Sequence, residues 1–472
     1  MSDLSSLSQR LPEGVISTHP GELTTRARDL WAMALLRERI GDRVPPPSAI
    51  AFPRSTDDVA TILAWAEESQ TPIVPRGGGS GVCGGAQAVR GSVVVDLSEM
   101  SHVLSVDEQS LTVEVEAGIR GERLERQLSE RGLTLGHYPQ SLAISSAGGW
   151  IATSSAGQAS AGYGVIEDLV LGMTVVLPGG KVVRLQATPR SAAGPDLKRL
   201  FVGSEGTLGI ITEATFSVSR SPDGLRWEAF APADFAGGIE LVRSVVQRGL
   251  RSLVVRLYDD TDANLVFGEV GHQGGPVLVL ALAGNTVGGS AQAEAMREEA
   301  GRHGARTLPS TFGDHWWDHR LDAVDTYRRI MGEERLLGDG VVVDTMEVAG
   351  LWSQLPKLYR AVQEALARRA EAVGCHLSHP YRSGASLYFT FLLRAPDDRR
   401  VRETYVSAWR DAATACQDAG GTITHHHGVG ILKSLFMERE LGAEGLRLLR
   451  TLKSSIDPNN LLNPGKLLPP DG

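Results

Sequence analysis

The chain has 472 residues, of which 42% are hydrophobic and 22% charged, so it is long enough for two or three domains with substantial cores. Its formal net charge of -9 argues against a nucleic-acid-binding surface as its main activity. Three cysteines without a CxxC pair exclude a disulfide framework and a thiolate zinc site. The amino-terminal sequence has no signal-like apolar core and the chain has no apolar run of about 18 residues, so we expect a cytoplasmic protein with at most peripheral membrane contact.

Glycine concentrates between residues 76 and 209, in loops between short β-type runs, which indicates a backbone that approaches a ligand closely. Upstream of these loops, Ser55 precedes acidic residues and an apolar stripe at helical spacing, which predicts a helix that begins there. The other elements predicted in this half are strands at 71–75, 92–97 and 111–117, a helix at 120–131, a hairpin with arms at 169–177 and 181–185, and a strand at 208–218.

The composition and residue pattern of the sequence change from about residue 225, where glycine loops become rare and helical patterns such as 355–372 appear. The tail resembles the first half again, with glycine-rich loops and Asp-Pro-Asn-Asn and Asn-Pro-Gly-Lys turns. We therefore divide the chain into a helical segment (1–45), a glycine-rich domain (46–222), a substrate-facing domain (223–420) and a C-terminal segment (421–472) that returns to the first site.

A Rossmann fingerprint has to be considered, because Gly79 to Gly84 matches GxGxxG and a strand ending in Asp96 follows. Only GAQAVRG lies between Gly84 and Ser92, whereas a parallel crossover helix needs at least about 10 to 12 residues. The spacing therefore excludes a Rossmann unit.

The glycine loop PRGGGSG at 75–81 can still bind a pyrophosphate through convergent backbone N–H groups, although a simple glycine-rich β-turn explains it equally well. Three further segments add to it: HYPQS to SSAGGW at 137–150, AGQ to YG at 156–164, and GSEGTLGI at 203–210. Together they resemble the FAD domain of the vanillyl-alcohol oxidase, or p-cresol methylhydroxylase, superfamily. This resemblance implies an α+β fold with a PCMH-type FAD-binding domain at 46–222 and a second α+β substrate, or cap, domain.

Some members of that superfamily link the flavin to a histidine in the first glycine loop. Residues 75–85 contain no histidine, so we expect FAD to be bound noncovalently, and we interpret Cys83 as a packed thiol. The resemblance assigns these residues to FAD binding: Pro75, Arg76, Gly77, Gly78, Gly79, Ser80, Gly81, His137, Gln140, Ser141, Leu142, Ser145, Ser146, Gly148, Gly149, Thr153, Ser154, Ser155, Ala156, Glu205, Gly206, Thr207, Leu208, Gly209, Ile210 and Ile211.

Within the superfamily, the chain is most similar to the alkyldihydroxyacetonephosphate synthases, through GHYPQSLAISSAGGW, YGVIEDLV, VRLYDD, SHPYRSGASLYFTF and THHHGVG. These enzymes exchange the acyl group of acyl-dihydroxyacetone phosphate for a fatty alcohol, with FAD as an electrophile and no net redox change. Their substrate carries a phosphate, a ketone and an acidifiable carbon, so the site needs cations and a proton carrier.

By this resemblance, Tyr381 falls on the family's catalytic tyrosine, which has to work below its usual pKa of about 10 and so needs positive charge nearby. His425, His426 and His427 are the candidates for that charge. If they lie on a strand, His425 and His427 share one face and His426 takes the other. The alternative is that Tyr381 is an ordinary strand aromatic near Tyr388. No metal site is expected, because no carboxylate or thiolate pairs with the histidines at a fitting spacing.

Arg256 interrupts the apolar β-run LVVRL and matches an arginine of the family, while Arg328 in DTYRRI is a second candidate for binding the substrate anion. A surface or ion-paired arginine is the alternative interpretation of each. The sequence also departs from the family, since Gln140 replaces an acid and TSSA at 153–156 replaces Thr-Arg-Ala-Ser.

Two enzymatic functions therefore stay open, the acyl-for-alkyl exchange and the oxidation of a D-2-hydroxy acid of the lactate or glycolate type. A flavin-binding protein without catalysis would leave Tyr381 and the histidines without a purpose. We expect a small-molecule or lipid-phosphate substrate and no nucleic-acid partner, with a homodimer left open.

Overall fold

The computed structural model describes residues 4–284 and 288–470. The helix predicted after Ser55 is α4 (Thr56–Ser69), and the Ser55 side chain accepts a hydrogen bond from the backbone N–H of Asp58 at 3.1 Å. Its apolar stripe is buried and packs on the strands β8 (Val170–Val176) and β10 (Ile210–Ser217). The sequence pattern thus places this helix correctly, with one apolar face against a sheet.

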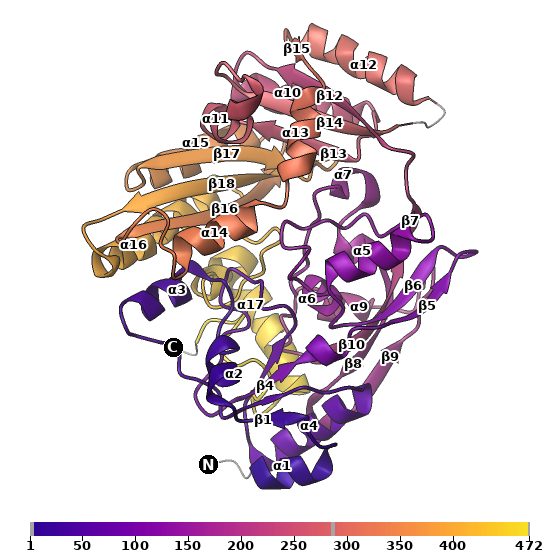
Figure 1. The fold of residues 1–472 in the computed structure, drawn as a ribbon, viewed down its shortest axis with the longest axis vertical. Coiled ribbons are helices and arrows are strands. Elements are labelled where there is room, and N and C mark those ends of the chain that lie inside the picture. The colour runs from indigo at the N-terminus through magenta and orange to yellow at the C-terminus, as the bar shows by residue number, and fades with distance from the viewer. Residues whose placement is uncertain (1–3, 285–287, 471–472) are drawn as a thin grey trace.

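Two main sheets form the glycine-rich half, in the lower part of Figure 1. One has four strands in the order β1-β2-β4-β3, and the other has five antiparallel strands in the order β5-β6-β10-β8-β9, where β8 and β9 are the predicted hairpin. A short ladder pairs β11 with β7. Besides β8 and β10, the strands are β1 (Ile16–Ser17), β2 (Ala49–Ala51), β3 (Ile73–Arg76), β4 (Val93–Asp96), β5 (Val103–Asp107), β6 (Thr112–Glu116), β7 (Leu133–Thr134), β9 (Val182–Leu185) and β11 (Ser219–Arg220).

Seven antiparallel strands form the large sheet of the other half, in the upper part of Figure 1, in the order β15-β12-β14-β13-β17-β18-β16. Their bounds are β12 (Leu225–Ala231), β13 (Val254–Tyr258), β14 (Val277–Ala283), β15 (Arg306–Leu308), β16 (Val341–Leu351), β17 (Ala372–Ser378) and β18 (Gly384–Arg394).

Helices lie on both sides of these sheets, and none that the structure describes is long and apolar enough to cross a membrane. They are α1 (Leu4–Arg10), α2 (Pro20–Thr25), α3 (Ala32–Arg39), α5 (Gly121–Ser129), α6 (Ala147–Ala152), α7 (Ser160–Tyr163), α8 (Ile166–Leu169), α9 (Lys198–Phe201), α10 (Phe235–Gln247), α11 (Asp260–Phe267), α12 (Gly289–Arg302), α13 (Thr311–His319), α14 (Ala323–Met331), α15 (Leu355–Ala367), α16 (Asp398–Asp418) and α17 (Met437–Ile456), with the 3-10 turns η1 (Leu97–Glu99), η2 (Pro178–Gly180), η3 (Gly268–Val270) and η4 (Ser434–Phe436).

The helix predicted at 355–372 is shorter than its pattern suggests. It ends at Ala367, and Ala372 already begins β17, where it lies opposite Leu392 of β18. Pairing with the neighbouring strand therefore overrides the helical preference of these last residues.

The two faces of the large sheet differ in character because apolar and polar residues alternate along its central strands. In β17, Val373, Cys375 and Leu377 join a large apolar core with helices α10, α15 and α16. His376, which alternates with them, lies on the opposite face and lines a cavity toward the glycine-rich half. This alternation is what brings polar chemistry to the boundary between the halves.

The C-terminal segment returns to the glycine-rich half, where the yellow helix α17 lies among purple elements in Figure 1. Leu462 forms a parallel bridge with Ile73 at β3. The Asn463 side chain donates hydrogen bonds to the backbone carbonyls of Gly85 at 2.9 Å and Glu205 at 2.7 Å. The end of the chain therefore supports two of the glycine-rich loops.

Candidate active site

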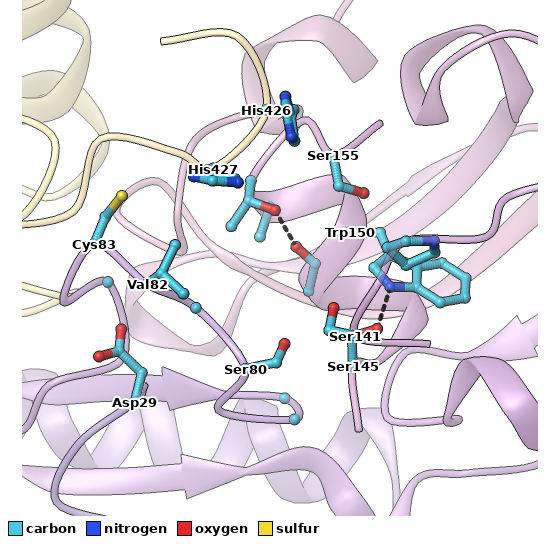
Figure 2. Close-up of a pocket in the computed structure, with 18 of the residues that line it drawn as sticks. Asp29, Ser80, Val82, Cys83, Ser141, Ser145, Trp150, Ser155, His426 and His427 are labelled. Atoms are coloured by element: carbon cyan, nitrogen blue, oxygen red, sulfur yellow. Dashed lines mark hydrogen bonds between the residues drawn. The ribbon is translucent and has the colours of Figure 1, made fainter. Parts of the chain in front are cut away.

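One cavity extends from the glycine loop to the polar face of the large sheet. Figure 2 shows Asp29 and Ser80 at its lower end and His426 and His427, on the C-terminal loop, at its upper end. The predicted residues that line it are Pro75, Arg76, Gly77, Gly78, Gly79, Ser80, Gly81, Gln140, Ser141, Ser145, Ser146, Gly148, Gly149, Thr153, Ser155, Ala156, Glu205, Gly206, Gly209, Ile210, Ile211, Arg256, His426 and His427.

The first glycines of the loop are required by the neighbouring chain. A Cβ at Gly77 would collide with the Ser146 hydroxyl, and a Cβ at Gly78 would collide with the backbone carbonyl of Ile144. Gly206 adopts a positive φ of 70° beside the Pro75 ring. Only residues without a side chain let these segments approach each other and leave their backbone facing the cavity.

Arg76 lines the cavity, but its charge is largely occupied by protein groups. Its Nη1 donates to the Arg28 carbonyl at 2.7 Å, and its Nε lies 3.8 Å from Asp96. Burial lowers its pKa, and Asp96 opposes that shift. An internal ion pair therefore reduces the positive charge that Arg76 offers to a ligand in the cavity.

Five residues predicted to bind FAD do not line the cavity. His137 is fully buried, and its Nε2 lies 2.8 Å from the hydroxyl of Ser155, which lines the cavity. Burial lowers the pKa of His137 to about 3, so its imidazole is neutral. The Thr207 hydroxyl donates to the Ser204 carbonyl at 2.8 Å. The other three are Leu142 and Leu208, which pack in the core, and Ser154, which has a positive φ in a turn.

Glu205 has a role in addition to lining the cavity, because it holds the histidine loop. Its carboxylate accepts hydrogen bonds from the backbone N–H groups of Val429 at 2.6 Å and Gly430 at 2.8 Å. Burial raises the pKa of Glu205 to about 7, against the lowering effect of these two backbone donors. This one side chain fixes the tail loop to the glycine-rich half.

The three adjacent histidines lie in a bend and not on a strand, so the prediction that they alternate between two faces is wrong. Their ring contacts follow a chain instead. The Tyr381 hydroxyl lies 2.9 Å from His425 Nε2, and His425 Nδ1 lies 2.8 Å from His426 Nδ1. His426 lines the cavity, so a continuous hydrogen-bonded path leads from Tyr381 into it.

The electrostatics around Tyr381 differ from the expectation. Burial and the nearby carboxylates of Glu167 and Asp168 raise the pKa of Tyr381. Burial lowers the pKa of His425 to about 4 and lowers the pKa of His426 as well. These imidazoles are therefore neutral near pH 7, and they connect the phenol to the cavity without supplying the predicted positive charge.

His427 belongs to a separate buried group. Its Nδ1 lies 2.9 Å from Glu347, whose other oxygen accepts from Lys433 Nζ at 2.6 Å and from the backbone N–H of His427 at 3.0 Å. Glu347 and Lys433 are both fully buried. Burial by itself would raise the pKa of Glu347, but His427 and Lys433 lower it well below its usual range. This ion pair fixes His427 against β16, and it lay outside the sequence-based prediction.

The two predicted arginines have different positions. Arg256, on β13, is buried in the cavity wall, its guanidinium lies 5.6 Å from the Trp316 ring, and its Nε has no hydrogen-bond acceptor among the described residues. Arg328 is exposed and does not line the cavity, because α14 turns Val324 and Tyr327 toward it and Arg328 away. The prediction of a second anion clamp at Arg328 is therefore not supported by its position.

Several residues of the cavity were missed from the sequence. His376 and Tyr388 alternate with apolar residues on β17 and β18, and that alternation could have identified them. Asp29 lies in a loop and its side chain accepts from the backbone N–H of Trp31 at 3.2 Å, a contact that no sequence pattern indicates. The missed lining residues also include Leu30, Val82, Cys83, Gly85, Ala86, Leu97, Pro139, Trp150, Ala152, Gln158, Ala323, Val324, Tyr327, Asp344, Thr345 and His379.

Comparison with known families decides the kind of protein that carries this cavity. The model of the C-terminal domain of FAD-linked oxidases matches residues 225–467, more than half of the chain, and the FAD binding domain matches residues 47–186. The chain belongs to the FAD-linked oxidases. FAD is therefore its cofactor, as the glycine loops predicted.

Relatives of this chain include two kinds of enzyme. An alkyldihydroxyacetonephosphate synthase of Trypanosoma brucei brucei is 31% identical, over 94% of this chain and 76% of the relative. The FAD-linked oxidoreductase YgcU of Escherichia coli strain K12 is 31% identical over 90% of both chains, and the glycolate oxidase subunit GlcD of Bacillus subtilis strain 168 is 28% identical over 90% of both chains.

Solved structures confirm the predicted fold of this chain. An alkyldihydroxyacetonephosphate synthase superposes with a TM-score of 0.80 at 24% identity, over 98% of this chain and 84% of that chain. A p-cresol methylhydroxylase with substrate bound gives 0.81 at 15% identity, over 99% and 97%. The protein thus has a PCMH-type FAD-binding domain and a second α+β domain.

The side chains and backbone of the cavity fit FAD. The loops around Gly77 and Gly206 keep backbone facing the cavity, and the buried Ser146 hydroxyl has no hydrogen-bond partner within the described part of the chain. A bound ligand would satisfy such a buried group. Cys83, the nucleophile nearest the loop, is buried and its pKa is raised well above the usual value, consistent with a packed thiol.

Proposed function

We propose that the protein is an FAD-dependent enzyme that exchanges the acyl group of acyl-dihydroxyacetone phosphate for a fatty alcohol, in the manner of the alkyldihydroxyacetonephosphate synthases. The observation that carries this proposal is the hydrogen-bonded path from Tyr381 through His425 to His426, which ends in the FAD cavity. When bound, FAD would supply an electron-poor ring system that can act as an electrophile.

The path can carry a proton in either direction because its imidazoles are neutral. With the proton of His425 on Nδ1, Tyr381 donates to Nε2 of His425 and His425 donates to His426. The opposite tautomers leave Nε2 of His426 as an acceptor in the cavity. An exchange without net redox has to remove a proton from the carbon beside the ketone and return it, and a reversible relay of this kind suits that need.

Arg256 supports the same proposal as the residue that binds the substrate anion. An anionic ligand would satisfy this buried guanidinium, whose Nε lacks a partner in the described part of the chain, and the planar fork of arginine matches a phosphate. Burial lowers the pKa of Arg256, but an arginine with such a high usual pKa still carries its charge near pH 7.

Oxidation of a D-2-hydroxy acid is the second candidate function. A carboxylate would satisfy Arg256 as well as a phosphate does, and relatives of similar identity include a glycolate oxidase subunit and a mitochondrial D-lactate dehydrogenase. The relay would then carry the hydroxyl proton to solvent.

Product analysis of the purified protein separates the two functions. One sample receives acyl-dihydroxyacetone phosphate and hexadecanol, and the other receives D-lactate or glycolate and an artificial electron acceptor. We expect the ether product and free fatty acid in the first sample and no acceptor reduction in the second. Acceptor reduction without exchange would replace the proposal with the oxidoreductase.

A further inference from the structure

A row of polar residues crosses four strands of the large sheet on the side of the FAD cavity. Tyr258 of β13 lies directly opposite His376 of β17, His376 opposite Tyr388 of β18, and Tyr388 opposite Glu347 of β16. Directly paired residues project from the same face of a sheet. Arg256 precedes Tyr258 by two positions and shares this face.

His376 in the middle of this row has a carboxylate partner that the proposed relay does not use. Its Nδ1 lies 2.9 Å from the Asp262 carboxylate of α11, and His376 and Asp262 are only 6% and 5% exposed. A Cβ at Gly374 would lie 2.7 Å from the Asp262 carboxylate, so the glycine lets α11 approach β17 this closely. The pair is therefore held by packing on both elements.

The orientation of the His376 ring is also fixed from both sides. The ring lies 5.1 Å from the Tyr258 ring and 4.8 Å from the Tyr388 ring. Asp262 occupies Nδ1, so Nε2 is the nitrogen that can meet a ligand in the cavity that His376 lines. Burial lowers the pKa of His376, which favours a neutral ring with the proton on Nδ1 and an acceptor at Nε2.

Arg256 and His376 thus offer two different kinds of contact side by side. The guanidinium can bind an anion, and the imidazole can accept a hydrogen bond from a hydroxyl group. We propose that His376, oriented by Asp262, binds a substrate hydroxyl group next to the anion held by Arg256 and accepts its proton during turnover. This inference rests on the proposed function and extends it to the second substrate, the alcohol.

In the exchange, the O–H bond of the fatty alcohol breaks and its proton moves to Nε2 of His376. The electron pair stays on the oxygen, which forms the new C–O bond to the carbon beside the ketone, while the bond between that carbon and the ester oxygen breaks and the fatty acid departs as a carboxylate. The imidazolium that forms is stabilised by Asp262 until the proton passes to solvent. No oxidant or reductant is consumed.

Ligand binding tests the hydroxyl contact independently of turnover. Dihydroxyacetone phosphate and hydroxyacetone phosphate differ by one hydroxyl group, on the carbon to which the alcohol oxygen bonds in the exchange, so this hydroxyl stands in for that of the alcohol. The dissociation constants of both ligands can be measured from the change that they cause in the flavin absorbance of the holoenzyme. We expect the wild type to prefer dihydroxyacetone phosphate about tenfold, the ratio that corresponds to a hydrogen bond of about 1.4 kcal/mol. His376→Phe should abolish this preference, and Asp262→Asn should reduce it.

Matched variants separate this contact from a structural role of the pair. Asp260→Asn, on the exposed side of the same helix, and His319→Gln, on the surface of α13, should retain the preference. A purely structural pair predicts that His376→Phe and His376→Gln lower the melting temperature while both ligands weaken equally. That result would overturn the inference, as would a wild type without any hydroxyl preference.

A second pair of ligands separates failure of this inference from failure of the proposed function. Glycolate and acetate also differ by one hydroxyl group next to an anion. Binding of the carboxylates alone, with a glycolate preference that His376→Phe removes, would overturn the phosphate substrate and support the role of His376. Binding of the phosphates with a preference that survives in both His376 variants would overturn the role of His376 and leave the proposed exchange intact.

Discussion

At the scale of single residues, burial determines whether the imidazoles near Tyr381 are protonated. The rings of His379, His425 and His426 lie within 5.5 Å of one another, and burial and mutual repulsion lower the pKa of His379 and His426. A cluster of neutral imidazoles can exchange tautomers, whereas a cluster of charged ones would only donate. This is why the proposed function gives Tyr381 a role in proton transfer and not that of a stabilised phenolate.

Tyr381→Phe should lower the rate of the exchange at least about 100-fold, because it removes the outer hydroxyl of the relay and keeps the ring. The flavin spectrum and the melting temperature should stay close to those of the wild type. Tyr359→Phe is the matched control, since it also removes a hydrogen-bonded hydroxyl, 3.1 Å from Asp259, on a helix that packs on the other face of the sheet. Equal rates in the wild type and Tyr381→Phe would show that the tyrosine is merely packed.

At the scale of elements, the site consists of loops that other parts of the chain hold in place. The glycine loop packs on the segment that contains Ile144 and Ser146, and the histidine loop is fixed by Glu205 and Glu347. Loops of this kind hold their functional groups in fixed positions only when the surrounding structure determines the conformation of their backbone.

Gly78→Val should lower FAD occupancy strongly, because its Cβ would collide with the Ile144 carbonyl and displace the loop. The ratio of flavin to protein absorbance in the purified protein measures this effect. Gly301→Val is the control, since nothing lies within 4 Å of a Cβ at Gly301. A fully loaded Gly78→Val protein would show that this loop is not a cofactor loop.

The raised pKa of Glu205 predicts that the unfolding free energy of the protein depends on pH. This pKa is raised from 4.5 to about 7 in the folded protein, so the folded state binds the proton more tightly than the unfolded state. The stabilising effect is complete below about pH 4.5 and is lost as the pH rises through 7. Relative to Glu205→Gln, the wild type should therefore lose about 3 kcal/mol of unfolding free energy between pH 4.5 and 8.

Chemical denaturation at several pH values measures this difference. Glu122→Gln, an exposed substitution of the same kind, should run parallel to the wild type. Glu205→Gln running parallel to the wild type as well would contradict a shifted pKa at Glu205.

The elements also show which features of the fold and of the site could be predicted from the sequence alone. The glycine loops, the helix after Ser55 and Arg256 could be predicted because each has a local signal, either a spacing or a charge in an apolar run. The Asp262–His376 pair could not be predicted, because its members are 114 residues apart and meet only when α11 packs on β17. The bend at His425 was missed since adjacent histidines carry no turn signal.

At the scale of the whole molecule, both ends of the chain contribute to one cavity between the halves. The Trp31 side chain donates to the Tyr405 hydroxyl at 3.1 Å, and Tyr405 donates to Asp344 at 2.8 Å, which joins the N-terminal segment to the large sheet. Asn463 supports the glycine loops from the other end. The cavity thus depends on contacts that are distant in sequence, and two of the lining residues that were not predicted, Gly85 and Asp344, take part in them.

Whether FAD is bound covalently or noncovalently can be tested on the intact holoenzyme. Because residues 75–85 contain no histidine and the Cys83 thiol is buried with a raised pKa, acid precipitation should release intact FAD into the supernatant. Absorbance of the supernatant and pellet measures the distribution. Flavin that stays with the denatured pellet would refute the noncovalent assignment.

Isotope transfer can show directly whether acyl-for-alkyl exchange takes place in this cavity. The purified holoenzyme is mixed with acyl-dihydroxyacetone phosphate and hexadecanol labelled with oxygen-18, and the products are analysed by mass spectrometry while the flavin absorbance is followed. The account predicts that the label appears in the ether product, that one fatty acid is released for each ether formed, and that no electron acceptor is needed. An unlabelled phosphate substrate recovered intact, together with bleaching of the flavin by D-lactate or glycolate, would contradict it.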